Sequence, residues 1–195
     1  KIDRTAPRFQ PLNAIGQVVV LDRINDNGRV KTVTAGFGTG ILLPGNLVLT
    51  NAHVGQDVGR IVQFKIGQTE PNNRNRWHDT IYGKVVNLGS RIGTIPEDWA
   101  LIALDTSSTD WNSKYGYITP SMMTAEAFQR ASENGQLMTA GYPGFKDPRY
   151  LWGQTQVQLL NETSEENGKK PEPSELAAAS SSGMSGGAVL YEYEE

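Results

Sequence analysis

The sequence has no cysteine among its 195 residues. Disulfide bonds, a thiolate nucleophile and a zinc site with cysteine ligands are therefore excluded. The compartment stays open, because many bacterial secreted proteins fold without disulfides. Histidine is nearly as scarce, with two residues in all, so few side chains can act as an imidazole base.

Positive charge is also in short supply. Lys and Arg number 18 against 21 Asp and Glu, which gives a formal net charge of −3. Proteins that bind nucleic acid usually show a basic surplus or clustered Lys and Arg, so we expect no nucleic-acid partner. The longest apolar runs, such as "WALIAL", are far shorter than a membrane span, and no signal peptide opens the chain. No membrane association is expected.

The first half of the chain is made of short β-branched or alternating segments, punctuated by Gly, Pro and Asn. Residues 14–23 predict a strand that runs into a hairpin turn at Asn27–Gly28. Further strands are predicted over 30–44, 46–54, 60–68, 80–88 and 98–104. About six strands at this spacing are typical of a β-barrel or a β-sandwich.

The second half is also rich in strand-like segments. Residues 106–120 have no sustained period and are interpreted as a connection. Residues 124–135 form the one predicted helix, ended by Asn134–Gly135. Strands are predicted over 136–144 and 150–160, and a mobile surface loop over 161–175.

The two histidines differ in their surroundings. His53 ends the apolar segment "NLVLTNAHV", which follows a glycine-rich stretch. A structural and a catalytic role are both open for it at this point. His78 lies in "NNRNRWHDT", a polar stretch predicted to be a loop, and is interpreted as a surface residue.

Asp98 stands just before "WALIAL", which is apolar enough to predict a strand buried on both faces. A carboxylate in that place must be paired or solvated, because burying it alone is very costly. The alternative role for Asp98 is that of a turn residue or strand cap.

Ser185 lies in "GMSGG", where glycines surround it on both sides. Glycines let the backbone adopt conformations closed to other residues and let a substrate approach closely. Such a turn can also point successive N–H groups into one space, as an oxyanion hole requires. A plain Gly-Ser turn is the alternative interpretation.

Together these three residues indicate nucleophilic catalysis. A serine hydroxyl is a weak nucleophile that needs an imidazole base, and the base needs a carboxylate on its other nitrogen. "GMSGG" also fits the nucleophile elbow of α/β-hydrolases, in which the acid and the histidine follow the serine. Here no histidine follows Ser185, and alternating strands and helices are lacking, so that alternative is excluded.

Three blocks, "GFGTGILLPGNLVLTNAHV", "DWALIALD" and "GMSGGAVL", resemble the signature blocks of trypsin-like serine proteases of the chymotrypsin fold. "GYPG" at 141–144 is similar to a strand end of the cysteine-free bacterial branch, which includes glutamyl endopeptidases. The resemblance implies an all-β fold of two packed six-stranded antiparallel β-barrels. We expect the first barrel in residues 1–112 and the second in residues 113–195.

The resemblance also implies the roles of individual residues. His53 is expected to be the general base, Asp98 its orienting acid and Ser185 the nucleophile. The backbone N–H groups of Gly183 and Ser185 are expected to form the oxyanion hole. Ala179, with Ser180 beside it, stands where trypsin-type enzymes carry an acidic pocket residue. We therefore expect a small or apolar pocket base and no preference for Arg or Lys.

The sequence departs from the family pattern at both ends. It opens "KIDRT" rather than with a small-hydrophobic end of the "IVGG" type, so activation by insertion of such an end is not expected. The strands that follow the serine strand in this fold are absent after "GAVLYEYEE". We expect that a further segment or another chain completes the second barrel.

The predicted function is a serine endopeptidase that works through a Ser-His-Asp triad and an acyl-enzyme. Its substrate is a protein or peptide, and neither a metal nor an organic cofactor is required. A secreted or periplasmic location is expected from the resemblance. The alternative is a catalytically silent, protease-like binding domain, or an inactive fragment that needs another segment.

Overall fold

The computed structural model describes residues 12–68, 77–89, 97–142, 151–155, 157–159, 176–177, 185 and 187–191. Strands predominate over these residues, which confirms the predicted all-β class. The strands of the first half are β1 (Ile15–Asp26), β2 (Arg29–Leu43), β3 (Leu47–Thr50), β4 (Ile61–Gln68), β5 (Trp77–Leu88) and β6 (Ala100–Leu104). Those of the second half are β7 (Leu137–Gly141), β8 (Trp152–Thr155), β9 (Gln158–Leu159), β10 (Leu176–Ala177) and β11 (Ala188–Tyr191). The helices are α1 (Ala52–Gly55), α2 (Trp111–Tyr115) and α3 (Ala125–Glu133).

The six strands of the first half close into one antiparallel barrel in the order β1-β2-β3-β6-β5-β4. β1 completes the ring by pairing with β4, where Val18 lies opposite Phe64. Because the ring closes, each barrel strand has a partner on both sides. The predicted six-stranded first barrel is therefore confirmed.

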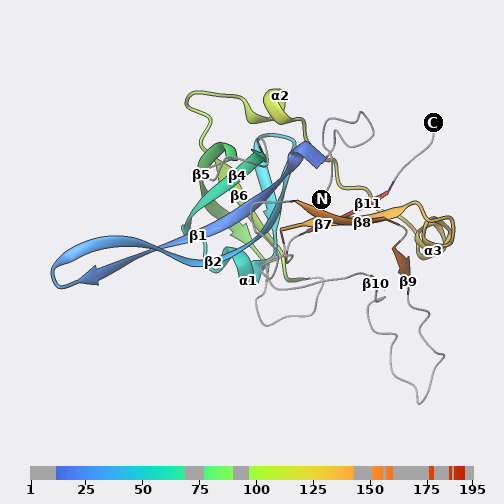
Figure 1. The fold of residues 1–195 in the computed structure, drawn as a ribbon, viewed down its shortest axis with the longest axis horizontal. Coiled ribbons are helices and arrows are strands. Elements are labelled where there is room, and N and C mark those ends of the chain that lie inside the picture. Colours follow the sequence, from blue (N-terminus) through green and yellow to red (C-terminus); the bar gives the residue numbers. More distant parts are fainter. Residues whose placement is uncertain are drawn as a thin grey trace, which may run out of the picture.

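β1 and β2 extend beyond the barrel as a two-stranded hairpin (Figure 1). At its tip Asn27 and Gly28 have φ values of 52° and 82°. A two-residue turn of type I′ needs positive φ at both central positions, which Asn and Gly tolerate best. Asp26 faces Arg29 across the turn, so the predicted hairpin is confirmed.

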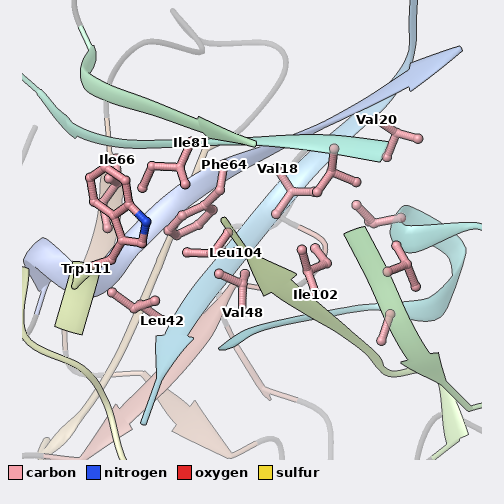
Figure 2. Close-up of a cluster of buried hydrophobic side chains, with 14 of the residues drawn as sticks. Val18, Val20, Leu42, Val48, Phe64, Ile66, Ile81, Ile102, Leu104 and Trp111 are labelled. Carbon is pink, nitrogen blue, oxygen red and sulfur yellow. The ribbon is translucent and has the colours of Figure 1, made fainter. Parts of the chain in front are cut away.

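The barrel interior is filled by apolar side chains from all six strands (Figure 2). Val18, Phe64 and Ile102 are completely buried there. Burying a side chain of this kind contributes about 1.5–3 kcal/mol to stability. This packed core gives a fixed frame to the segments that leave the barrel.

β6 alternates between buried and half-buried residues along its length. Ala100, Ile102 and Leu104 face the core, while Leu101 and Ala103 are partly exposed. The prediction that this strand is buried on both faces was therefore wrong. In a barrel every second residue points away from the interior, and small or aliphatic side chains are tolerated there.

β5 begins at Trp77, earlier than the sequence predicted. The backbone of Trp77 pairs with Gln68 and that of Asp79 with Ile66. His78 therefore lies in a strand, and its prediction as a loop residue was wrong. Backbone pairing with β4 holds this polar segment in the sheet.

The second half contains a three-stranded antiparallel sheet in the order β11-β7-β8 and a separate pair, β10-β9. A second closed barrel is not seen among the residues that the structure describes. The strand predicted over 150–160 is two short strands, β8 and β9, and the loop predicted over 161–175 lies outside the described residues. The three-stranded sheet packs against the start of β1 through the cluster Leu12, Ile15, Ala140, Tyr142, Leu151 and Ala188.

Two helices lie between the barrel and this sheet in the sequence. α3 confirms the predicted helix: the Thr124 hydroxyl caps it by accepting the Ala127 N–H at 3.2 Å, and Gly135 with φ 68° follows its end. α2 was not predicted within 106–120, because five residues are too few to show a helical period. Asp110 caps α2 by accepting the Asn112 N–H. In the described ranges no helix has the length and apolar character to cross a bilayer.

Candidate active site

His53 lies in the short helix α1, directly after β3. A strand end was predicted here, but β3 stops at Thr50 and a four-residue helix follows. The N–H groups of Val54 and Gly55 donate to the Asn51 carbonyl at 3.1 and 2.9 Å. The first N–H groups of a helix have no partner within it, and the Asn51 side chain does not cap this one. An acceptor must therefore come from elsewhere.

Asp98, two residues before β6, supplies that acceptor. Its Oδ1 accepts the backbone N–H of His53 at 3.0 Å, and its Oδ2 lies 2.7 Å from Nδ1 of the same residue. The pairing of β3 with β6, with Thr50 opposite Ala100, brings the two segments together. Because a carboxylate only accepts, Nδ1 is the donor, and Nε2 is left as the proton acceptor of the neutral ring.

Asn51 holds the same acid from a second direction. Its Nδ2 donates to the Asp98 backbone carbonyl at 2.8 Å and to Asp98 Oδ2 at 3.1 Å. No role was predicted for Asn51 from the sequence. Its place two residues before His53 was the only available signal, and its partner is 47 residues away.

The Asp98 carboxylate is stabilised in its charged form. Burial raises the pKa of Asp98, but hydrogen bonds from the backbone and ring of His53, the charge of that ring and the Ala52 N–H together outweigh burial. The pKa of Asp98 consequently lies below its usual value. The Asp98 side chain is 25% exposed and that of His53 is 51% exposed. An ionised acid thus lies beside an imidazole that is half exposed to solvent.

The chain turns sharply after α1. Gln56 has φ 68° and ψ −71°, and the Asp57 N–H donates to the Gly55 carbonyl at 3.0 Å. This is a γ-turn of the rare, strained kind, which costs roughly 1–3 kcal/mol at a non-glycine residue. Arg60 Nη2 donates to Gln56 Oε1 at 2.7 Å and supports the turn. The turn ends the helix two residues after His53.

Ser185 is tied to the barrel by its backbone. Its carbonyl accepts the Thr39 N–H of β2 at 2.8 Å, and the residue is half-buried. A Cβ added at Gly38 would lie 2.9 Å from the Ser185 carbonyl oxygen and 2.7 Å from Val54 Cγ2. Ser185 and Val54, the residue after His53, therefore both pack against Gly38 of β2. Only a residue without a side chain leaves room for this approach. Between the described atoms of Ser185 and His53, no hydrogen bond joins the hydroxyl to the ring.

The remaining predicted site residues lie outside the described part of the chain. These are Gly183 of the expected oxyanion hole and Ala179 and Ser180 of the expected pocket. Of His78 the structure describes only its place in β5. No group of three His, Cys, Asp or Glu side chains that could hold a metal ion occurs among the described residues.

A family model described as a trypsin-like peptidase domain matches residues 38–195. The chain belongs to this family. The match includes β2 from Gly38 onward, both ends of the His53–Asp98 pair, and Ser185. Membership of a trypsin-like peptidase family indicates a hydrolase with protease activity.

The fold of the chain is also similar to that of a protease of known structure. The crystal structure of Rv3671c protease, in its inactive form, matches this trypsin-like peptidase domain with a TM-score of 0.53 and 16% sequence identity. The match covers 96% of this chain and 77% of that chain. At this identity the likeness shows the fold alone. A search of curated proteins found no match.

Proposed function

We propose that this trypsin-like peptidase domain is a serine endopeptidase. Ser185 Oγ attacks the carbonyl carbon of a peptide bond while His53 Nε2 takes its proton. His53 then protonates the leaving amine, which departs and leaves an ester on Ser185. Water, deprotonated by His53, hydrolyses the ester and restores the serine. The negative charge of Asp98 stabilises the imidazolium that forms twice in this cycle.

The observation that carries the proposal is the pairing of His53 with Asp98. The acid holds the residue at both its backbone and its ring, at 3.0 and 2.7 Å, so the orientation of Nε2 is set before substrate binds. A buried or surface histidine with a purely structural role needs no acid at both places. Ser185 is hydrogen-bonded to Thr39, and the adjacent Gly38 packs against Val54, the residue after His53. These contacts support a position of Ser185 close to the His53 imidazole.

The finer features follow the family resemblance. Gly183 and Ser185 are proposed to donate N–H groups to the oxyanion, and Ala179 and Ser180 to form a pocket base that does not favour Lys or Arg. Membership of the cysteine-free bacterial branch with glutamyl endopeptidases is supported by "GYPG" at 141–144 and by the absence of cysteine. No proposed step uses a metal or organic cofactor, and the proposed location is secreted or periplasmic.

Peptide hydrolysis by the wild type and by Ser185→Ala tests the proposal. A pool of peptides is incubated with each protein, and the products are identified by mass spectrometry. Loss of the nucleophile should lower kcat by a factor on the order of 10⁶, because the triad acts as a unit. The melting temperature should stay the same. Equal cleavage by both proteins would contradict the assignment of Ser185.

A second candidate is a protease-like domain that binds peptides without cleaving them. It is favoured by the lack of a hydrogen bond between the Ser185 hydroxyl and His53 among the described atoms. Calorimetric titration separates the two candidates. Binding of an intact peptide that is recovered uncut after long incubation would support the silent domain, and turnover would exclude it.

A further inference from the structure

Thr39 lies in the glycine-rich part of β2, is fully buried, and is bonded through its backbone and its side chain. Its N–H donates to the Ser185 carbonyl at 2.8 Å, and its Oγ1 accepts the Tyr142 N–H at 2.9 Å. Its carbonyl accepts the Thr50 hydroxyl at 2.7 Å. The partners belong to the serine turn, to the residue after β7, and to the last residue of β3 before α1. One residue therefore joins the segments that carry both halves of the candidate site.

The bond to Ser185 bears directly on the direction of its side chain. A fixed carbonyl limits rotation about the Cα–C bond of Ser185 and so orients its Cα–Cβ bond relative to the barrel. The backbone of β2 around Thr39 is closely packed and has little room to move. A Cβ at Gly38 would meet Val54 and the Ser185 carbonyl, and one at Gly40 would meet Val48 at 2.6 Å. Thr39 is thus held between two close-packed glycines.

The bond to Tyr142 reaches Ser185 by a second route. Tyr142 directly follows β7, and β7 pairs with β11, where Ala140 lies opposite Ala188. Ala188 comes three residues after Ser185 in the sequence. The Tyr142 hydroxyl also donates to the Ile15 carbonyl of β1 at 3.2 Å. The sheet that contains β11 is therefore bonded to β2 through the Tyr142 backbone and to β1 through the Tyr142 hydroxyl.

We propose that Thr39 is a positioning residue for the nucleophile. Its hydroxyl fixes the end of β7, its N–H fixes Ser185, and together they set the serine at a constant place relative to His53. The catalytic consequence rests on the proposed function, whereas the structural link does not. A hydroxyl with a merely structural role would cost stability when removed, but would leave the rate of the remaining folded protein unchanged.

Three variants of the full chain test this role. Thr39→Val keeps the shape and backbone of Thr39 and removes the acceptor for Tyr142, while Thr39→Ser keeps that acceptor. Val62→Ala truncates a fully buried core residue of β4, away from the site, and serves as the control for lost stability. Each variant is compared for its melting temperature, its kcat and KM on a peptide, and its rate of labelling by a fluorophosphonate.

We expect Thr39→Val to lower kcat and the labelling rate by about ten-fold to a hundred-fold with KM unchanged, because small displacements of reacting groups are costly. Thr39→Ser should recover most of the rate. Val62→Ala should lose melting temperature and keep its rate. A wild-type rate in Thr39→Val, or equal losses in Thr39→Val and Thr39→Ser, would overturn the proposal.

Amide hydrogen exchange, followed by NMR, tests the structural link from Thr39 to Ser185 without a measurement of catalysis. If the wild type neither cleaves nor labels, the proposed function fails and exchange decides the role of Thr39. Faster exchange at Tyr142 together with a shifted Ser185 signal in Thr39→Val, both restored in Thr39→Ser, would support the link. Unchanged Ser185 signals would overturn it.

Discussion

The Asp98 carboxylate binds His53 twice, at its backbone N–H at 3.0 Å and at its ring Nδ1 at 2.7 Å. One acid therefore caps the first turn of α1 and selects the tautomer of the imidazole that α1 carries. Placement of the helix and preparation of the base depend on the same charge. Changes to Asp98 should consequently affect folding and catalysis together.

Asp98→Asn tests the tautomer. An amide can donate to Nδ1, which would move the ring proton to Nε2 and leave no acceptor for the serine hydroxyl. We expect kcat to fall by about 10⁴. Steady-state kinetics on a peptide substrate measure this, with circular dichroism as the control for folding. A loss smaller than about ten-fold in a folded variant would contradict the role given to Asp98.

The pH dependence of stability reports the same carboxylate. The pKa of Asp98 lies below the ordinary value of 3.8, so the native state favours the ionised form. Its contribution to stability is present above the unfolded pKa and is lost as the pH falls through the lower native pKa. Urea denaturation at several acidic pH values should show a steeper loss of unfolding free energy for the wild type than for Asp98→Asn. Parallel curves for the two proteins would contradict this expectation.

Asn51→Ala removes both bonds that the Asn51 amide makes to Asp98. The acid should then turn more freely and hold His53 less well, so kcat should fall by about ten-fold with little change in KM. Asn25→Ala is the matched control, because its side chain accepts the Gly28 N–H in the distant hairpin turn. That variant should retain full activity. Equal kcat values for Asn51→Ala and the wild type would contradict a role of Asn51 in holding Asp98.

The glycines of β2 make a sharper pair of tests. Gly38→Ala would place a methyl group 2.7 Å from Val54 Cγ2 and 2.9 Å from the Ser185 carbonyl oxygen. Relieving the second contact would require the backbone at Ser185 or in β2 to move. Gly36→Ala, two residues earlier, would meet only the end of the flexible Gln56 side chain at 3.4 Å. We expect Gly38→Ala to lose most of its activity and several degrees of melting temperature, and Gly36→Ala to stay close to the wild type. Assays of peptide hydrolysis and thermal unfolding compare them, and similar behaviour of the two variants would contradict the close approach described at Gly38.

The sequence predicted best the features that local chemistry determines. The hairpin at Asn27–Gly28 and the helix ended by Gly135 depend on residues that tolerate positive φ, and this preference is visible in single residues. The alternation of apolar residues likewise predicted the six barrel strands. The start of β5 was missed because its first residues lie in a polar stretch, and their strand conformation comes from pairing with β4.

The candidate site depended on contacts between distant residues. His53 and Asp98 are 45 positions apart, and they were joined in advance by the chemistry that a serine nucleophile requires and by the family resemblance. The helix at His53 was not predicted because its capping acid, Asp98, comes from a distant segment just before β6. Asn51 and Thr39 were missed for the same reason, since the partners that give them a role lie 47 and 103 positions away.

The most direct test of the central claim is covalent labelling by a fluorophosphonate, with the modified residue identified by mass spectrometry. Only a hydroxyl activated by a neighbouring base reacts quickly with such a probe. We expect one adduct, on Ser185, in the wild type, and a severe loss of labelling in His53→Ala with the fold retained. An adduct on another residue, or equal labelling of Ser185 with and without the His53 imidazole, would contradict the account.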